Sequence, residues 1–308
     1  MSNKVLDLSI HNGYVDFKKV KKAGIYGIIQ RMGYGQSYID PTANRNIDKA
    51  LSLGLKVGAY WFIYAYTKED AIKEADFFNK CLLRYKGKLE LPVFADYEYD
   101  SERYANRMGV NLTKSLRTEI VKAFCDRLEE YGWYVGNYCN VDYYQNKWYQ
   151  KELDRFDLWI ADWRMNPNKE IIKKSGIWQY TSTGRVDGVN GNVDINIIYK
   201  DYPSIIREYG LNGFKKKNNR KSNDELADEV LKGLWGNGDS RRLSLIKAGY
   251  NYDEVQKKVN EKLKRKDINK IARDVIQGKL GNGLTRKRKI EALGYDYLEV
   301  QKEVNKLI

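Results

Sequence analysis

The chain has 308 residues, of which 42% are hydrophobic, enough for one large folded domain with a smaller part or for two medium domains. Its net charge of +14 is uneven, because residues 215–308 hold 24 Lys and Arg against 14 Asp and Glu. A basic tail predicts a polyanionic partner, and charge alone leaves nucleic acid, anionic lipid and acidic wall polymers open.

Histidine and cysteine usage narrows the chemistry. The only histidine is His11, whereas a catalytic zinc site usually needs two or three, so composition argues against zinc amidases and peptidases, and we expect no metal or cofactor. Cys81, Cys125 and Cys139 are an odd number without metal-site spacing, which indicates reduced core thiols. The first residues lack a signal-peptide pattern and no run could span a bilayer, so we expect synthesis in a bacterial cytoplasm without membrane insertion.

Short apolar runs alternate with helical patterns up to residue 209, which predicts a parallel sheet. The expected helices include Asp16–Ala23, Ala43–Leu53, Asp70–Leu83 and one that carries Leu116 and Leu128 on its apolar face. The strands are expected at Val5–Ile10, Gly27–Arg31, Val57–Tyr64, Leu91–Tyr97, Tyr134–Tyr138, Leu158–Trp163, Ile177–Tyr180 and Val193–Ile198. Eight strands in this length predict an α/β fold of the (β/α)-barrel type, irregular near its end, where little helix separates the last three strands.

The tail is an internal duplication. Leu226–Leu263 aligns without gaps with Ile271–Ile308, and 16 of 38 positions are identical. Each copy is predicted to form three short helices, separated by a Gly-Asn-Gly turn and a Gly-Tyr pair. We therefore expect a barrel over 1–214, a basic linker over 215–224, and two all-α three-helix repeats over 225–264 and 265–308.

Asp96 and Glu98 form the densest acidic cluster on a strand, in LPVFADYEYD. Residues two apart on a strand point the same way, so both carboxyls should share a face at the strand's carboxyl end, where parallel barrels carry their active sites. Two carboxyls this close hold one proton more tightly, and glycoside hydrolysis needs such a pair. Cation ligands or solvated strand-end charges are the alternatives.

Two further acids, Asp7 and Asp194, also lie in strand-like runs. An isolated strand aspartate usually anchors a turn, but four acids at one barrel mouth would repel one another. Surplus negative charge suits a site that stabilises an oxocarbenium-like transition state.

The barrel region resembles glycoside hydrolase family 25, the phage-type and fungal-type lysozymes. The resemblance is carried, in family order, by LDLSIHNGYVDFKKVKKAGIYGIIQRMGYG, DPTANRNIDKALSLGLKVGAYWFIYA, FADYEY, LWIADW and WQYTSTGRVDGVNGNVDINIIY. One departure is Trp61, where many members carry histidine.

The resemblance implies a peptidoglycan N-acetylmuramidase that retains the β configuration. Glu98 matches the general acid and base, Asp96 the assisting carboxylate, and Asp7 and Asp194 the remaining acids of the mouth. The side chains implied to line the sugar cleft, with barrel packing as the alternative, are Tyr60, Trp61, Tyr64, Tyr138, Trp163 and Gln179.

The tail copies resemble the three-helix wall-binding repeats of some phage lysozymes, which bind the muropeptide unit. The shared Gly-Asn-Gly, Arg and Gly-Tyr-x-Tyr pieces carry this similarity. They imply that Arg241 and Arg286, with Tyr250 and Tyr295, contact wall ligands. The positive charge of the tail, not the resemblance, adds acidic wall polymers as a second expected partner. A solvated helix charge is the alternative for each arginine.

The sequence leaves other functions open. A wall amidase, a cysteine endopeptidase that pairs His11 with Cys125 or Cys139, and a non-catalytic wall-binding barrel are the alternatives. Nucleic-acid binding is suggested by charge alone, and the repeats lack its recognition signatures. The family implies an endolysin that acts on the cell wall after release through the membrane.

Overall fold

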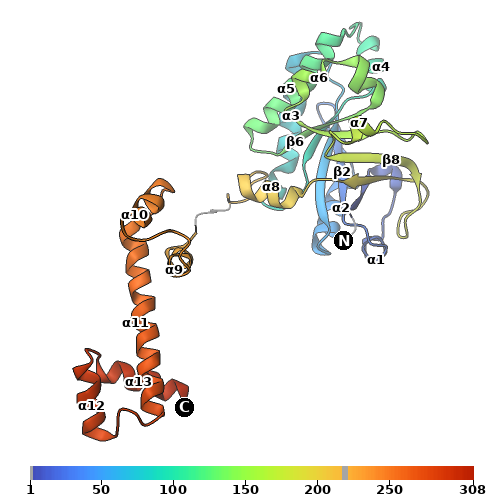
Figure 1. Ribbon diagram of the computed structural model, residues 1–308. Coiled ribbons are helices and arrows are strands. Elements are labelled where there is room, and N and C mark those ends of the chain that lie inside the picture. Colours follow the sequence, from blue (N-terminus) through green and yellow to red (C-terminus); the bar gives the residue numbers. More distant parts are fainter. Residues whose placement is uncertain (1–2, 217–220) are drawn as a thin grey trace. The chain divides into compact units, whose positions relative to one another are not determined.

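The computed structural model describes residues 3–216 and 221–308. The chain divides into two compact units, residues 1–218 and 219–308 (Figure 1). Residues 217–220, inside the linker expected over 215–224, lie outside the described residues.

The first unit is a closed barrel. Among its described residues, eight strands pair in the order β1-β2-β4-β5-β6-β7-β8-β9, and β9 returns to β1. The short β3 pairs only with the end of β2. The strands are β1 (Lys4–Leu8), β2 (Gly27–Tyr34), β3 (Tyr38–Ile39), β4 (Lys56–Phe62), β5 (Val93–Asp96), β6 (Val135–Asn140), β7 (Asp157–Ala161), β8 (Ile177–Gly184) and β9 (Val193–Ile198).

The expected irregularity lies where the barrel closes. Apart from β3, the strands from β1 to β8 run parallel around the barrel, whereas β9 is antiparallel to both β8 and β1. The β8–β9 ladder also shifts register twice, between Gln179 and Thr181 and again before Gly184. A hairpin therefore replaces the last βα unit, which confirms the irregular barrel predicted from the sequence.

Helices cover the outside of the barrel (Figure 1). Threonine side chains cap the two longest, since Thr67 accepts from the backbone N–H of Asp70 and Thr113 from that of Leu116. The helices of this unit are α1 (Phe17–Lys22), α2 (Ala43–Ser52), α3 (Lys68–Leu82), α4 (Tyr99–Arg107), α5 (Lys114–Glu130), α6 (Gln150–Leu153), α7 (Lys169–Ile172) and α8 (Tyr202–Tyr209). Short helical turns add η1 (Ile10–Asn12), η2 (Leu83–Tyr85) and η3 (Tyr143–Lys147).

Alternation along the strands builds two apolar layers. One cluster takes residues from around the barrel interior, such as Val5, Ile29 and Trp159. The larger cluster takes their strand neighbours, such as Leu6 and Ile28, with the inner faces of the helices. Toward the carboxyl ends of the strands, the next inward-facing positions carry polar side chains, and these side chains form the site.

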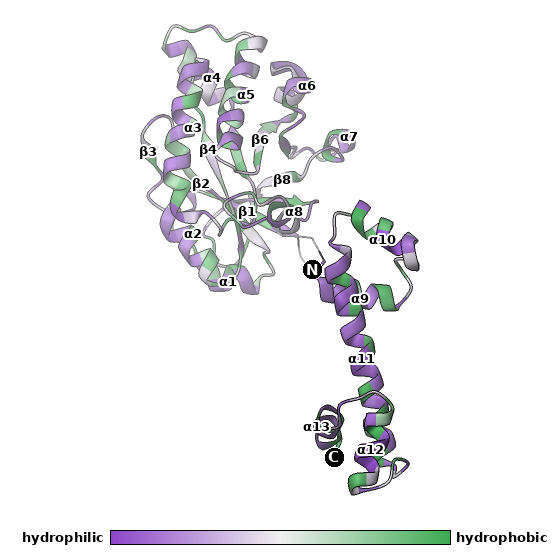
Figure 2. Ribbon diagram, turned by 90° about the vertical axis from the view of Figure 1, so that its left-hand side faces the viewer, coloured by the Kyte–Doolittle hydropathy of each residue, from purple (hydrophilic) through white to green (hydrophobic). Residues whose placement is uncertain are grey.

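The second unit contains two three-helix repeats that share a helix. Its helices are α9 (Asn223–Leu231), α10 (Gly238–Lys247), α11 (Tyr252–Ile276), α12 (Gly283–Ala292) and α13 (Tyr297–Leu307). α11 is the third helix of the first copy and the first helix of the second, so the boundary expected between 264 and 265 falls inside it. Most residues of α11 are hydrophilic (Figure 2).

Duplication is visible in the cores of the two repeats. The first core contains Leu226, Ala227, Val230, Leu245, Val255 and Val259. The second contains the residue 45 positions later in every case, with Ile268 added. Each copy therefore buries its own small core by the same pattern.

Candidate active site

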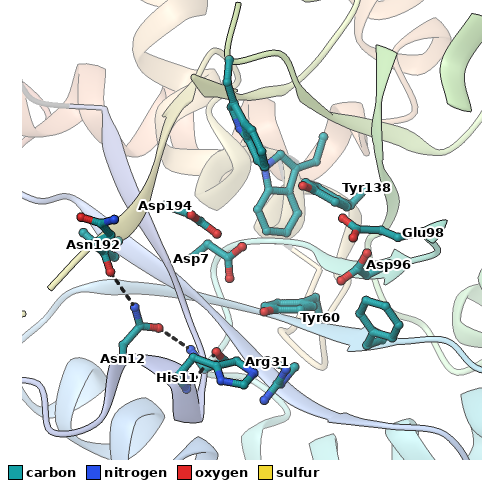
Figure 3. Close-up of a pocket in the computed structure, with 15 residues that line it drawn as sticks. Asp7, His11, Asn12, Arg31, Tyr60, Asp96, Glu98, Tyr138, Asn192 and Asp194 are labelled. Carbon is teal, nitrogen blue, oxygen red and sulfur yellow. Dashed lines mark hydrogen bonds between the residues drawn. The ribbon is translucent and has the colours of Figure 1, made fainter. Parts of the chain in front are cut away.

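A cavity of about 350 Å³ opens at the carboxyl end of the barrel strands (Figure 3). Its walls combine acids, aromatic rings and loop amides from both ends of the barrel sequence. The lining residues are Asp7, Ser9, His11, Asn12, Arg31, Tyr60, Phe62, Asp96, Glu98, Tyr138, Trp159, Trp163, Asn192, Val193 and Asp194. All four acids predicted from the sequence therefore meet in one cavity.

Asp96 and Glu98 lie side by side on one wall (Figure 3). Asp96 is the last residue of β5 and is 6% exposed. Glu98 occupies the N-cap position of α4, and its backbone N–H donates to Ser101 Oγ at 3.2 Å. The strand and the helix start thus place both carboxyls toward the cavity, as their spacing predicts.

Asp7 and Asp194 face each other on the opposite wall. The antiparallel pairing of β1 with β9 makes them direct partners in the ladder. The amide Nε2 of Gln179 donates to Asp7 Oδ2 at 3.2 Å. The β8–β9 hairpin therefore brings an acid from residue 194 against one from residue 7.

Burial and mutual repulsion hold protons on this cluster. Burial raises the pKa of Asp7 and of Asp96 well above the usual range, and Asp194 and Glu98 respectively add to the rise. Burial also raises the pKa of Asp194 to about 6. The pKa of Glu98 is raised by burial, although the neighbouring Tyr138 hydroxyl lowers it. The cluster consequently holds its protons more tightly than free carboxyls do.

Among the described residues that line the cavity, Arg31 is the only arginine or lysine. It follows Ile29 on the inward face of β2, and its Nη2 lies 3.0 Å from Asp40 Oδ2. Asp40 also accepts from the backbone N–H of Ile10 and from Thr42 Oγ1, so the guanidinium is held in place. Its charge lowers the pKa of Asp7 and of Asp96, against the effect of burial.

Gln179 connects the two walls. Its Oε1 accepts from the Tyr138 hydroxyl at 3.0 Å and from the Trp163 indole at 3.1 Å, while its Nε2 reaches Asp7. Gln179 itself is buried and supports residues that line the cavity. Tyr60, Tyr138 and Trp163 line the cavity directly, as predicted.

Of the six residues predicted to line the cleft, Gln179 and two others do not line it. Trp61 is fully buried behind β4, where its ring stacks on Phe78 at 5.3 Å and its indole donates to the Gly35 carbonyl. Tyr60 faces inward, so its strand neighbour must face the helices, and the assignment of Trp61 to a sugar subsite is wrong. Tyr64 lies beyond the end of β4 and packs on Tyr104 without lining the cavity.

A second cavity of about 700 Å³ adjoins the first and shares Glu98, Tyr138 and Trp163 with it. Its remaining lining residues are Tyr99, Asn140, Val141, Asp142, Gln145, Asn146, Ala161, Asp162 and Arg164. Glu98 therefore stands between two cavities. Asp7, Asp96 and Asp194 line only the first, and the second has its own aspartates, of which Asp162 is paired with Arg164.

Several lining residues were missed from the sequence. Arg31 and Trp159 occupy inward positions that the period-two pattern of their strands could have identified. His11, Asn12 and Asn192 lie outside the strands, and Asn12 Nδ2 donates to the Asn192 carbonyl at 3.4 Å. No sequence signal identifies such loop residues, because the ends of the barrel sequence meet only after closure.

The thiols lie apart from the histidine. His11 lines the cavity, but Cys125 and Cys139 are fully buried in the layer between strands and helices. Burial raises the pKa of both thiols well above the usual range, so neither is a ready thiolate. This geometry does not support a cysteine peptidase.

In the tail, each predicted arginine binds its own turn. Arg241 Nε donates to the Gly236 carbonyl at 3.1 Å, and Arg286 Nε donates to the Gly281 carbonyl at 3.0 Å. Each guanidinium also reaches the asparagine of its Gly-Asn-Gly turn. Tyr250 and Tyr295 pack at the edge of the two cores. The same arrangement thus recurs in both copies.

Within 3–216 and 221–308, no three His, Cys, Asp or Glu side chains are grouped so as to hold a metal ion. In the same ranges, no helix is both long and apolar enough to cross a membrane.

Comparisons with known proteins follow the division into two units. The profile of glycosyl hydrolases family 25 matches residues 6–189, and that of the CW_7 repeat matches 224–263 and 269–308. β9, which carries Asp194, follows the matched barrel stretch.

The chain is similar to several lysozymes and autolysins. The lysozyme of Streptococcus phage Cp-7 is 31% identical over 83% of this chain and 69% of its own length. The autolytic lysozyme of Clostridium acetobutylicum is 27% identical over 63% of this chain and 55% of its own. The autolysin LytC of Streptococcus pneumoniae, solved with a synthetic peptidoglycan ligand, has 27% identity and a TM-score of 0.57, and the match covers 64% of this chain and 46% of LytC.

Proposed function

The chain belongs to glycosyl hydrolase family 25 and is a glycoside hydrolase of the lysozyme type, and we propose that Glu98 is the acid and base with which it cleaves peptidoglycan. The bond cut is the β-1,4 link between N-acetylmuramic acid and N-acetylglucosamine. The observation that carries this proposal is the position of Glu98 between two cavities, beside Asp96 and across the first cavity from Asp7 and Asp194.

The glycan crosses both cavities in this proposal. Asp7, Asp96 and Asp194 lie on one side of Glu98, where their negative charge would stabilise the positive charge that develops at the anomeric carbon. The muramic acid residue therefore occupies the first cavity. The leaving N-acetylglucosamine occupies the second, against Trp163 and Tyr99.

Glu98 acts first as an acid. Its carboxyl proton passes to the glycosidic oxygen, the bond to the anomeric carbon breaks, and the electron pair stays on the leaving oxygen. The substrate's N-acetyl oxygen then bonds to the anomeric carbon, while Asp96 orients and stabilises the N-acetyl nitrogen. Glu98 next takes a proton from water as that water attacks the anomeric carbon. The bond between this carbon and the N-acetyl oxygen breaks, and its electron pair returns to the acetamide. Two inversions at one carbon retain the β configuration.

Asp7 and Asp194 are proposed to bind substrate hydroxyls and to supply negative charge. Gln179 positions Asp7, Tyr138 and Trp163 together, and is therefore a positioning residue. Tyr60 closes the floor of the same cavity.

The tail repeats are proposed to bind muropeptides, with the excess positive charge of residues 215–308 attracting acidic wall polymers. The matched CW_7 profile and the lysozyme relatives support this assignment. The place of action that follows is the bacterial cell wall.

A matched pair of substitutions tests the role of Glu98. Glu98→Gln removes the transferable proton and keeps the shape, so clearing of purified walls should fall by about 10²–10⁴-fold. Glu170→Gln makes the same exchange at an exposed carboxylate on α7 that pairs with Lys173 and lines neither cavity, so it should leave clearing near the wild-type rate. Clearing by Glu98→Gln at the rate of Glu170→Gln would overturn the assignment.

A further inference from the structure

Helix α11 belongs to two cores at once. In its first half, Val255 and Val259 pack with residues of α9 and α10. In its second half, Ile268, Ala272 and Val275 pack with residues of α12 and α13. The two repeats are therefore joined by a helix that each needs for its own core, with no loop between them.

The two cores use opposite faces of this helix. Ile268 follows Val259 by nine residues, which is about two and a half turns at 3.6 residues per turn. Val275 follows Val255 by 20 residues, again about half a turn out of phase. The helix thus fixes both the spacing of the repeats and their rotation about its axis.

Ion pairs hold the junction on both sides. Lys262 Nζ lies 2.6 Å from Asp228 and 3.0 Å from Asp224, both on α9 of the first repeat. Two residues later, Lys264 Nζ lies 3.0 Å from Glu299 on α13 of the second repeat. The sequence from 252 to 276 contains neither Gly nor Pro, so the helix has no break at which the repeats could swivel.

Each repeat presents the same arginine-and-turn arrangement, Arg241 with Gly236-Asn237 and Arg286 with Gly281-Asn282. Two similar sites on a rigid spacer suit a partner that displays one ligand many times at regular positions. A flexible linker would lose most of this advantage to conformational entropy.

We propose that α11 is a rigid spacer that sets the distance and rotation of the two repeats so that both bind one peptidoglycan surface simultaneously. This inference rests on the proposed binding of muropeptides by the repeats. The partner is the polymer with its recurrent muropeptides, and a single soluble muropeptide would gain nothing from the spacer.

Insertions between Leu263 and Lys264 test whether the rotation between the repeats matters. Lys262 stays with the first repeat and Lys264 with the second, so the ion pairs of both lysines are kept. Seven helix-forming residues add about 10 Å and return to nearly the same rotation, whereas five add about 8 Å and turn the second repeat by about 140°. A third variant inserts five Gly and Ser residues. All are made in the full chain with Glu98→Gln, so that the walls are not degraded, and binding to purified walls is measured by sedimentation.

The rigid-spacer proposal predicts that the five-residue helical insertion weakens wall binding by about 10²-fold and the flexible insertion by at least about tenfold, with the seven-residue insertion weakened least. Affinity for a soluble disaccharide-peptide from the same walls should stay unchanged in all variants, which controls for damage to the sites. If all variants bind walls with equal affinity, the rigid-spacer proposal is overturned, while the proposed binding of muropeptides by the repeats stands. Absence of wall binding by the uninserted chain would overturn the muropeptide proposal as well.

Discussion

At the scale of single residues, the active-site cavity is lined by four acids and by Arg31, a cation that its neighbours hold in place. Arg31 lowers the pKa of Asp7 and of Asp96, while burial and the neighbouring acids raise both. Because Asp40 and its own partners hold the guanidinium, this charge cannot move away when substrate binds. Arg31 should therefore determine how many of the acids are ionised at the working pH.

Arg31→Met tests this balance. Without the cation, the pKa of Asp7 and of Asp96 rises, so both stay protonated to higher pH and the acidic limb of the pH–rate profile moves to higher pH. We expect a shift of about one pH unit and a fall of roughly tenfold in kcat/KM at neutral pH. Arg31→Lys keeps the charge and should retain the wild-type limb. An identical limb in Arg31→Met would contradict the electrostatic role.

Asp96→Asn should lose most activity and also change the pH profile. Burial and the neighbouring Glu98 raise the pKa of Asp96, and an amide at 96 has no proton to lose in this range. The acidic limb of the profile should therefore move to lower pH. A normal rate with an unchanged profile would show that the two carboxyls act independently.

The sequence identifies the acids better than the aromatic residues around them. Asp96 and Glu98 stand out because two carboxyls end an apolar strand, and that pattern has few structural explanations. Trp61 and Tyr60 are adjacent aromatics in one strand, and either could face inward until a neighbouring strand fixes the register. The choice depends on barrel closure, which local sequence does not encode.

At the scale of elements, Glu74 ties helix α3 to the segment after β4. Its carboxylate accepts the backbone N–H of Tyr64 at 3.2 Å, and Phe62 just before it lines the cavity. Burial raises the pKa of Glu74 to about 8. The folded state therefore prefers the protonated acid, and its stabilising effect, complete below the unfolded pKa near 4.5, is lost as pH rises toward 8.

Glu74→Gln removes this titration. The variant should match the wild type near pH 5 and be more stable above pH 8, by an amount on the order of a few kcal/mol. Thermal unfolding of the barrel, followed by tryptophan fluorescence at several pH values, measures the difference. A stability difference that does not change between pH 5 and pH 9 would contradict a titrating Glu74.

The sequence predicts some helices and strands better than others. Strands and long amphipathic helices were found, since their periodicity is local, and the irregular barrel closure was foreseen from the missing helix. Helix α11 was expected as two helices, because the duplication suggested two separate units. The sequence does contain evidence for a single helix, because the chain from Tyr250 to Gln277 has no Gly or Pro. In addition, Ser222, which caps α9 in the first copy, corresponds to Asp267 in the second copy, and Asp267 lies inside α11.

At the scale of the whole molecule, catalysis and wall attachment are proposed to reside in different units. Residues 1–214 contain every barrel strand and the complete cavity. This fragment should fold and cut soluble wall fragments at nearly the full rate, while binding whole walls more weakly than the full chain. Loss of activity on soluble fragments, with the fold intact by circular dichroism, would show that the tail contributes to the chemistry.

Salt separates the two contributions of the tail. Screening acts over about 8 Å at physiological ionic strength, so added salt should remove attraction between the basic tail and acidic polymers but leave direct muropeptide contacts. Wall binding should therefore fall only in part. The double variant Arg241→Ala with Arg286→Ala should remove much of the remainder, because it loosens both Gly-Asn-Gly turns and deletes the proposed contacts. If salt alone released all of the protein from the walls, the tail would bind only through its positive charge, and the proposed muropeptide contacts would be contradicted.

The most direct test of the proposed activity is analysis of the products from purified peptidoglycan. We predict new reducing ends on N-acetylmuramic acid by mass spectrometry, and the β anomer as the first product seen by NMR. New reducing ends on N-acetylglucosamine, new amino groups without reducing ends, or an initial α anomer would each contradict the proposed roles of Glu98 and Asp96.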